Sequence, residues 1–376
     1  MATSQGESVP PPILPGFESP ANDYRPKFRY WLPDASVPAE SVVRDIEAIE
    51  AVGAGGIEFV PFYAYGLAPS DNLPSDWRIY GFADLRFDFA LGASQGQGVP
   101  AEPESTGLAM ELVYGAVSVD GGELFQGSLP EPNLEFNFSP GIMNAPERFG
   151  SNEMIGVVAE GVKSNLSSEI VLDESTFTDV TTSVIKGTLE WRAPNQYANY
   201  TLFAFYQRYT NQRSCTSGPD AKDIIANGSW IVDHFSATGA ERIVDFWDQH
   251  LLDDAIKDLL SAAGEYSWEG MEMQAALFWT QDFVERFEAN RGYSPIKYLP
   301  IYFNAGNQWG AVRPPYNTTY VLDSQATEGE NYLQDYRMTL DEGYTKFLTH
   351  YQNWANSLGL NHSAQVQWDA ISLKTL

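Results

Sequence analysis

Two acidic residues, Glu269 and Glu272, stand three positions apart in the stretch YSWEGMEMQAALFWTQDF at 266–283. Carboxyl groups held among large apolar side chains can serve as general acids or bases. The second half of the stretch, however, has the pattern of a first helical turn, near which the helix dipole favours negative charge. The sequence therefore predicts either catalytic carboxylates or two solvated acids near the start of a helix.

Another carboxylate, Glu58, lies inside the apolar stretch GIEFVPFY. A charge in such surroundings is costly unless it is paired with an opposite charge or used in binding. Both a structural ion pair and a substrate contact fit this position, and the sequence leaves the choice open.

Other candidates stand near the ends of expected strands, where the active sites of α/β barrels are built. Asp233 and His234 could bind substrate hydroxyl groups, although helix capping by Asp233 or Ser236 is the favoured alternative. The remaining candidates for substrate contacts are two glutamines in a glycine loop, an aromatic residue that could also belong to the core, and a glutamine that closes the last strand: Gln95, Gln97, Trp31 and Gln365.

The composition narrows the range of partners. Fifty acidic and 22 basic residues give a formal charge of −28, which repels nucleic acid and anionic membrane surfaces. An aromatic content of 14%, together with many carboxylate and amide side chains, suits a site that stacks on sugar rings and binds their hydroxyl groups. We therefore expect an oligosaccharide or polysaccharide partner, and neither a nucleic acid nor a membrane.

The cellular compartment is indicated by glycosylation signals. Cys215 is the only cysteine, which excludes an internal disulfide, and no Cys/His cluster has zinc spacing. The first 20 residues contain no apolar leader, so we expect a secreted protein whose signal peptide is not part of this sequence. We predict N-glycosylation at five N-x-S/T sequons: Asn165, Asn199, Asn227, Asn317 and Asn361.

Hydrophobic periodicity predicts alternating strands and helices near the N-terminus. KFRYWLP reads as a strand, residues 42–52 have apolar side chains at helical spacing, and GIEFVPFY reads as a buried strand of a parallel sheet. RFDFALG is the expected third strand. The segment before it has no amphipathic helix, although parallel strands are normally joined by one.

The pattern changes to period two between about 108 and 210, which predicts an antiparallel β-sandwich. Helical periodicity returns in AERIVDFWDQHLLDDAIKDLLSAAG. Thr280 is the expected cap of a short helix that ends at Gly292, and a long helix at 330–358 precedes a last strand, HSAQVQW.

These elements predict an α/β fold, an incomplete (β/α)8 TIM-type barrel interrupted by an inserted antiparallel β-sandwich. A doubly wound sheet is the alternative, but the glycine-rich GAGG precedes its strand, whereas a dinucleotide-binding loop follows one. We predict an extended lead-in, a first part of the barrel, the sandwich and a truncated second part of the barrel, at 1–26, 27–107, 108–215 and 216–376.

Four stretches occur in an order typical of one family. They are FRYWLPDASV followed by DIEAIEAVGAGGIEFVPFY, TLEWRAPNQYANYTLFAFYQRYT, WIVDHFSATGAERIVDFWDQHL and FWTQDFVERFEANRGYSPIKYLP. The last is similar to a W-T-x-x-F…F…R-G-Y-x…Y-L-P signature. From about 28 to 367 the chain therefore resembles the α-L-rhamnosidase-like enzymes of glycoside hydrolase family 106 and related fungal secreted proteins.

The resemblance implies a barrel enzyme that removes terminal rhamnose-like sugars from plant-type glycans with inversion, and calcium dependence in some members. Inversion needs one carboxylic acid to protonate the leaving oxygen and a carboxylate about 6.5–9.5 Å away to activate water. The resemblance makes Glu272 the catalytic glutamate, with Glu269 as its neighbour or alternative.

The sequence departs from that family in three places. The family's second glutamate has no counterpart because the sequence ends at VQWDAISLKTL, the helix before Arg86 is missing, and WEGMEM is shortened. We therefore expect a truncated or mis-spliced member in which hydrolysis is impaired. The alternative is a non-catalytic carbohydrate-binding or scaffold protein.

Overall fold

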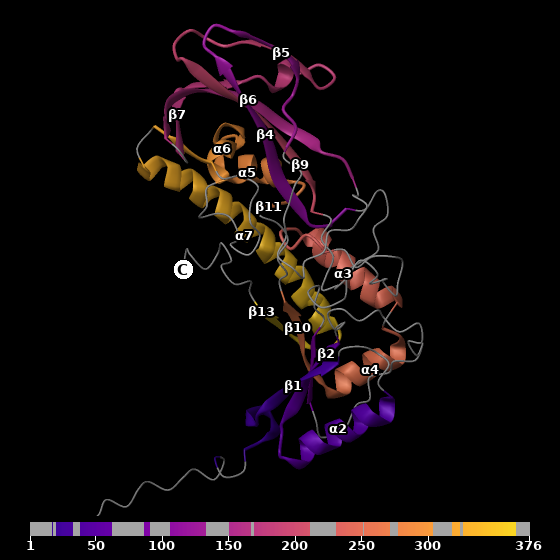
Figure 1. Cartoon of the computed structure of the whole chain (residues 1–376). Coiled ribbons are helices and arrows are strands. Elements are labelled where there is room, and N and C mark those ends of the chain that lie inside the picture. Colours follow the sequence, from indigo (N-terminus) through magenta and orange to yellow (C-terminus); the bar gives the residue numbers. More distant parts are fainter. Residues whose placement is uncertain are drawn as a thin grey trace, which may run out of the picture.

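The molecule is elongated, with one sheet at each end and a long helix, α7 (Ala326–Ser357), running between them (Figure 1). With a rise of 1.5 Å per residue, the 32 residues of α7 span about 48 Å. The computed structural model describes residues 17, 20–32, 38–61, 86–90, 106–132, 150–166, 169–210, 231–250, 252–270, 277–303, 318–323 and 326–365.

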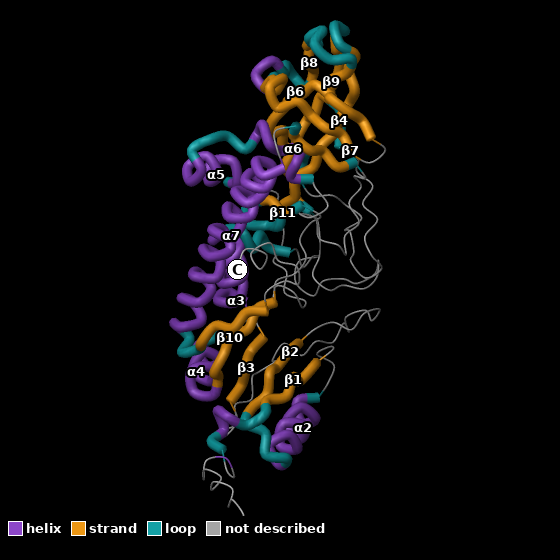
Figure 2. Tube along the Cα trace, turned by 90° about the vertical axis from the view of Figure 1, so that its left-hand side faces the viewer, coloured by secondary structure: helices purple, strands orange, loops and turns teal. Residues whose placement is uncertain are grey.

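The first sheet consists of five parallel strands that lie side by side in chain order (Figure 2). They are β1 (Lys27–Leu32), β2 (Gly56–Pro61), β3 (Arg86–Ala90), β10 (Gly264–Gly270) and β13 (Asn361–Gln365). A doubly wound sheet reverses its strand order at one point, whereas the order of these strands never reverses. The order favours a barrel wall, but the described strands do not close into a barrel, so the complete barrel remains a prediction.

Helices cover one face of this sheet. Tyr30 of β1 donates a hydrogen bond to Asp45 of α2 (Ala39–Ala51), with 2.8 Å between the oxygens. The His362 ring of β13 packs edge-on against Tyr351 of α7, with 5.0 Å between the ring centroids. Because side chains alternate along a strand, the neighbouring residues of β1 and β10, including Arg29 and Trp268, belong to the opposite face.

The face that points away from the helices is concave. Since β2 and β3 separate β1 from β10, a flat sheet would hold these two strands about 14 Å apart. Lys27 of β1 nevertheless forms an ion pair with Glu265 of β10, and Arg29 Cζ lies 5.2 Å from the centroid of the Trp268 ring. The sheet therefore curls until side chains of β1 and β10 meet across its hollow, as the wall of a barrel does.

The second sheet has six strands and lies at the other end of α7. Four of them pair antiparallel, as the period-two pattern predicts, and two strands from beyond residue 215 extend the sheet. In sheet order they are β11 (Phe278–Trp279), β4 (Met110–Asp120), β9 (Asn199–Tyr209), β6 (Glu153–Leu166), β7 (Glu169–Asp179) and β12 (Thr319–Leu322).

The two faces of the six-stranded sheet are covered differently. On one face lies a two-stranded ribbon of β5 (Leu124–Ser128) and β8 (Thr188–Arg192), which shares a small apolar core with β6 and β9. The other face packs against α7 and the short helices α5 (Phe283–Arg291) and α6 (Leu299–Tyr302). A ribbon and helices, rather than two full sheets, thus enclose the described part of the predicted sandwich.

The short 3-10 turns are η1 (Asn22–Tyr24), η2 (Thr181–Ser183) and η3 (Ile296–Tyr298).

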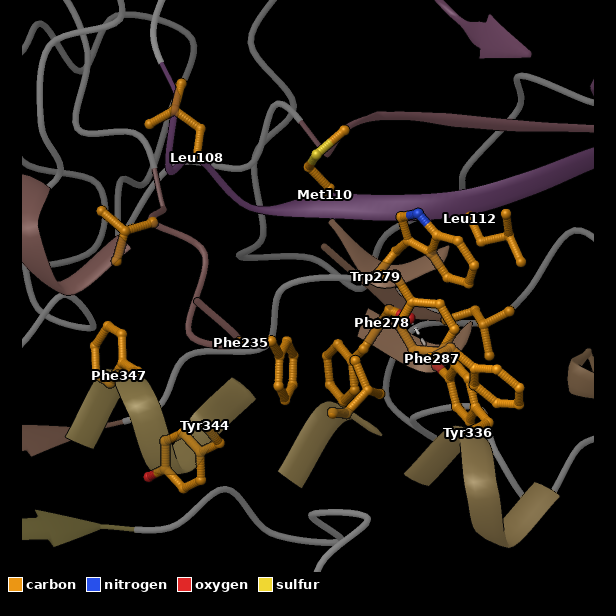
Figure 3. Packing of buried hydrophobic residues seen from close by; sticks show 14 of the residues in the cluster. Leu108, Met110, Leu112, Phe235, Phe278, Trp279, Phe287, Tyr336, Tyr344 and Phe347 are labelled. Atoms are coloured by element: carbon orange, nitrogen blue, oxygen red, sulfur yellow. Dashed lines mark hydrogen bonds between the residues drawn. The ribbon is translucent and has the colours of Figure 1, made fainter. Parts of the chain in front are cut away.

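The main core follows one face of α7 (Figure 3). Its helix residues are buried at spacings of three and four: Leu333, Tyr336, Leu340, Tyr344, Phe347, Tyr351 and Trp354. Near one end of the helix, Tyr336 lies close to Phe278, Trp279 and Phe287, and further along Phe347 lies near the β4 side of the core (Figure 3). The helix therefore contributes to a single core that reaches from one sheet to the other.

The predicted helical stretch at 240–264 is broken into α3 (Ala237–His250) and α4 (Asp254–Ala263). Asp253 caps α4, because its carboxylate accepts a hydrogen bond of 2.8 Å from the backbone nitrogen of Ile256. The interruption rotates the buried face, so Leu260 is 1% exposed while Leu259, expected on the inner face, is 36% exposed. The uninterrupted periodicity was therefore a wrong prediction.

A buried carboxyl group, Glu160 of β6, lies on the face that the helices cover. Its side chain is fully buried, and neither of its oxygens has a hydrogen-bond partner among the described residues. Burial raises the pKa of Glu160 to about 8. The positive charge of Lys297 opposes this shift, and the negative charges of Glu174 and Asp173 add to it. Lys297 is engaged with Glu174, at 2.7 Å, so Glu160 is held as a neutral acid at neutral pH.

Replacing Glu160 with Gln should therefore stabilise the protein near neutral pH. Between about pH 4.5, the ordinary value, and about pH 8, the folded chain keeps a proton that the unfolded chain releases, so wild-type stability falls as pH rises. We expect Glu160→Gln to raise the free energy of unfolding by about 1–3 kcal/mol at pH 7. Urea denaturation at pH 4, 6 and 8 measures this.

The same variant should gain nothing at pH 4, where both side chains are neutral. Exposed Glu123→Gln is the matched control and should leave stability unchanged at every pH. A Glu160→Gln variant that is less stable than wild type at pH 8 would contradict the assignment of a neutral buried acid.

Candidate active site

The parallel sheet brings three predicted site residues to one edge. Trp31 and Glu269 are next to last in β1 and β10, and Gln365 is the last residue of β13. Glu269 is in register with Ala364, one position before Gln365. Since all five strands are parallel, their carboxyl ends form a single edge, which is the edge where barrel enzymes build their sites.

Glu58 lies in the middle of β2 and is paired. It is in register with Arg29 of β1 and accepts two hydrogen bonds from that guanidinium group, from Nε to Oε2 and from Nη2 to Oε1, both of 2.8 Å. The pair meets solvent, because the side chains are 37% (Arg29) and 18% (Glu58) exposed. The ion-pair alternative is therefore confirmed, and the partial exposure leaves the carboxylate accessible to a ligand.

Trp268, which is not among the residues predicted from the sequence, lies beside this ion pair. It occupies the concave face of β10, two positions before the strand ends, is 8% exposed, and has the Arg29 guanidinium 5.2 Å from its ring centroid. The period-two spacing of Tyr266 and Trp268 in GEYSWEG could have identified it, because that spacing puts both aromatic rings on one face of a strand.

A second ion pair lies on the same face, two positions earlier in β1 and further from the carboxyl ends of the strands. Lys27 of β1 bonds to Glu265 of β10, and its ammonium group stands 5.2 Å from the centroid of the Tyr266 ring. The two described cations of the concave face are thus each matched by a carboxylate. Together the two layers form a hollow that is polar, partly aromatic and balanced in charge.

Asp233 and His234 lie away from this edge, at the start of α3. Asp233 is 2% exposed and accepts hydrogen bonds from the Phe235 backbone nitrogen (2.8 Å) and from the Thr280 hydroxyl (2.5 Å). Burial raises its pKa to about 6, although these bonds oppose the shift. His234 is fully buried against Phe347, and burial lowers its pKa to about 3. Both side chains thus hold the core together.

Helix capping accounts for the polar residues around them. The Ser236 hydroxyl accepts a hydrogen bond of 3.2 Å from the Gly239 backbone nitrogen and so caps α3, as expected. The predicted cap of α5 by Thr280 is wrong, because its hydroxyl donates to Asp233 instead. Gly292 ends α5 in the left-handed conformation, with φ of 78°, as predicted.

Several predicted residues lie outside the described part of the chain: Glu272, Gln95, Gln97, Cys215, Asn227 and Asn317. Among the residues that are described, no three His, Cys, Asp or Glu side chains come together in a way that could hold a metal ion. Of the helices that the structure describes, none is long and apolar enough to cross a membrane.

Comparisons with known proteins show similarity to a sequence relative and to a solved structure. No family model matches the chain. A protein of Formosa agariphila named "Putative beta-glucuronidase" is 23% identical over 383 aligned positions, which cover 94% of this chain and 30% of that protein. A solved rhamnosidase from Novosphingobium sp. PP1Y matches with a TM-score of 0.59 and 13% identity, over 93% of this chain and 47% of the rhamnosidase.

The structural match shows the fold alone, and both matches cover only part of the matched proteins. At 13% identity, the structural neighbour shows a shared fold and nothing further. The chain spans 30% of the length of the first protein and 47% of the second, so it corresponds to only part of each.

The buried hydrogen bond of Thr280 should be important for stability. Thr280→Val keeps the shape of the side chain but leaves the Asp233 carboxylate without its hydroxyl donor in a fully buried position. We expect the free energy of unfolding to fall by about 1–3 kcal/mol, measured by urea denaturation at pH 7. Thr349→Val removes an exposed hydroxyl of α7 and is the control. Equal stability of the two variants would contradict this role.

Proposed function

We propose that this chain is part of a secreted glycoside hydrolase that removes terminal rhamnose-like sugars from plant-type glycans with inversion. The observation that carries the proposal is the hollow face of a parallel sheet in which Arg29, Glu58 and Trp268 meet below the carboxyl edge. Aromatic rings beside carboxylates are typical of sugar sites. The names of the two similar proteins, a glucuronidase and a rhamnosidase, support the same class of reaction.

Two carboxyl groups perform the proposed reaction. Glu272, or Glu269 as the alternative, is one of them, because both belong to the segment that includes the end of β10. One group protonates the leaving oxygen and the other removes a proton from the attacking water, so the second must come from another strand. Five of the substrate contacts predicted from the sequence remain proposed: Glu58, Gln95, Gln97, Trp31 and Gln365. Asp233 and His234 are left out because both are buried in the core.

Among the side chains that the structure describes, the pairing of charges in the hollow supports a neutral sugar rather than a uronic acid. A uronate carries a carboxylate, which needs a cation that is not already neutralised. Arg29 is matched by Glu58, and Lys27 by Glu265. A rhamnose-like deoxy sugar needs only hydroxyl contacts and an apolar surface.

A non-catalytic role in carbohydrate binding is the second candidate. It is favoured by the same pairing, since Glu58 and Glu265, the described carboxylates of the hollow, are each engaged with a cation. Measured turnover decides between the two candidates.

The test of the proposed function is hydrolysis of 4-nitrophenyl α-L-rhamnopyranoside, with 4-nitrophenyl β-D-glucuronide as the comparison. We expect impaired turnover, of the rhamnoside only, and Glu272→Gln should lower kcat by a further factor of about 10²–10⁴ because the transferred proton is lost. Exposed Glu285→Gln in α5 is the control and should keep full activity.

Three outcomes would contradict parts of this proposal. Turnover of the glucuronide alone would overturn the sugar assignment, and a Glu272→Gln variant with full activity would overturn the role of Glu272. Binding of methyl α-L-rhamnopyranoside without turnover would favour the non-catalytic candidate.

Secretion is proposed from the sequons. Asn165, Asn199 and Asn361 are exposed, which glycosylation requires. Expression through a eukaryotic secretory pathway should yield a protein whose mass falls on treatment with an N-glycosidase, and each Asn→Gln change should remove one glycan. A secreted protein of unmodified mass would contradict the prediction.

A further inference from the structure

We infer that Trp268 is the aromatic floor of the proposed sugar site and that Arg29 is the positioning residue that holds Trp268 and Glu58 in place. This inference rests on the proposed function. It adds two residues to the site, Arg29 and Trp268, neither of which the sequence motifs identify.

The position of Trp268 in the sheet is the first argument. It is in register with Ala90 of β3 and Ser363 of β13, two residues before β10 ends at Gly270. Its neighbour Ser267 is in register with His362, whose ring faces α7. Strand alternation therefore puts Trp268 in the last described layer of the hollow face of β10, directly below the edge where barrel sites lie.

The contacts of Arg29 are the second argument. Its guanidinium group gives two hydrogen bonds to Glu58 and stands 5.2 Å from the Trp268 ring centroid. A planar guanidinium can bind a carboxylate through its N–H groups while it stacks on an aromatic face, which a lysine ammonium cannot do. Because these contacts join β1, β2 and β10, Arg29 fixes the relative positions of the carboxylate and the indole.

The chemistry of this unit matches a neutral pyranose. An indole presents a flat apolar surface to the C–H face of a sugar ring. The Glu58 carboxylate has about four lone-pair sites and uses two of them for Arg29, so it can still accept hydrogen bonds from sugar hydroxyls. At 8% exposure Trp268 is the bottom of a site rather than a surface platform, and only part of its ring would touch the ligand.

A purely structural role for the three residues is the competing explanation. It predicts that substitutions change stability alone. A role in the site predicts in addition that sugar binding perturbs the indole of Trp268 and that binding weakens in variants that remain folded.

The experiment measures the binding of methyl α-L-rhamnopyranoside to the full chain by calorimetry and by tryptophan fluorescence. We expect Trp268→Phe and Arg29→Lys each to raise Kd by about 3–10-fold, since one ring contact is reduced or displaced. The change in fluorescence on adding the sugar should disappear in Trp268→Phe. Circular dichroism establishes that each variant is folded, and Trp268→Tyr replaces Trp268→Phe if the latter does not fold.

Two substitutions elsewhere are matched controls. Trp191→Phe changes a partly buried indole of the β5–β8 ribbon, and Arg291→Lys changes an arginine that pairs with Glu342 at 2.7 Å between two helices. Both should bind the sugar as the wild type does, and Trp191→Phe should keep the change in fluorescence.

The outcomes separate this inference from the proposed function. Wild-type affinity and an unchanged fluorescence response in Trp268→Phe and Arg29→Lys would overturn the inference and leave the proposed function standing. A wild-type chain that binds no rhamnoside would overturn both.

Discussion

The continuous apolar face of α7 is the constraint on which the rest of the structure depends. Near its start, Tyr336 donates a hydrogen bond of 2.6 Å to the Phe278 carbonyl in the six-stranded sheet, and near its end Tyr351 packs on His362 of the parallel sheet. Midway, Gly343 lets the helix approach a loop so closely that a Cβ there would stand 2.1 Å from the Phe235 carbonyl oxygen. A glycine inside a helix lowers its stability, so its use here follows from that close approach.

The Phe235 loop explains why a conspicuous polar sequence is structural. Arg286 of α5 donates a hydrogen bond of 2.8 Å to the Phe235 carbonyl, and Asp233 receives one from Thr280. These bonds tie the start of α3 to α5 beneath α7. Buried polar groups that are satisfied in this way fix one packing arrangement. The VDHFS motif therefore holds the start of α3 against α5.

Sequence patterns predicted the elements better than they predicted contacts between them. Four of the five strands of the parallel sheet and α7 followed from periodicity, because each buries one continuous face, whereas the strand β10 was not predicted. The break at Asp253 was missed because the apolar residues keep their helical spacing across it, and spacing alone does not show where a new helix is capped. Glu58 remained ambiguous because its partner, Arg29, is 29 residues away and only strand pairing brings them together. Trp268 was missed because its contact with Arg29 forms only when the sheet curls and brings β10 close to β1.

Curvature and charge together limit where a catalytic carboxyl group could stand. Curling the sheet brings Lys27 and Arg29 of β1 over β2 and β10, where they neutralise Glu265 and Glu58. Such pairing is needed in a partly desolvated hollow, because an unpaired charge there would be costly. It also leaves each of these two acids engaged with a cation of β1. Two further acids, Glu269 and Glu272, follow Trp268 in the sequence, and the general acid of the proposed reaction would be one of them.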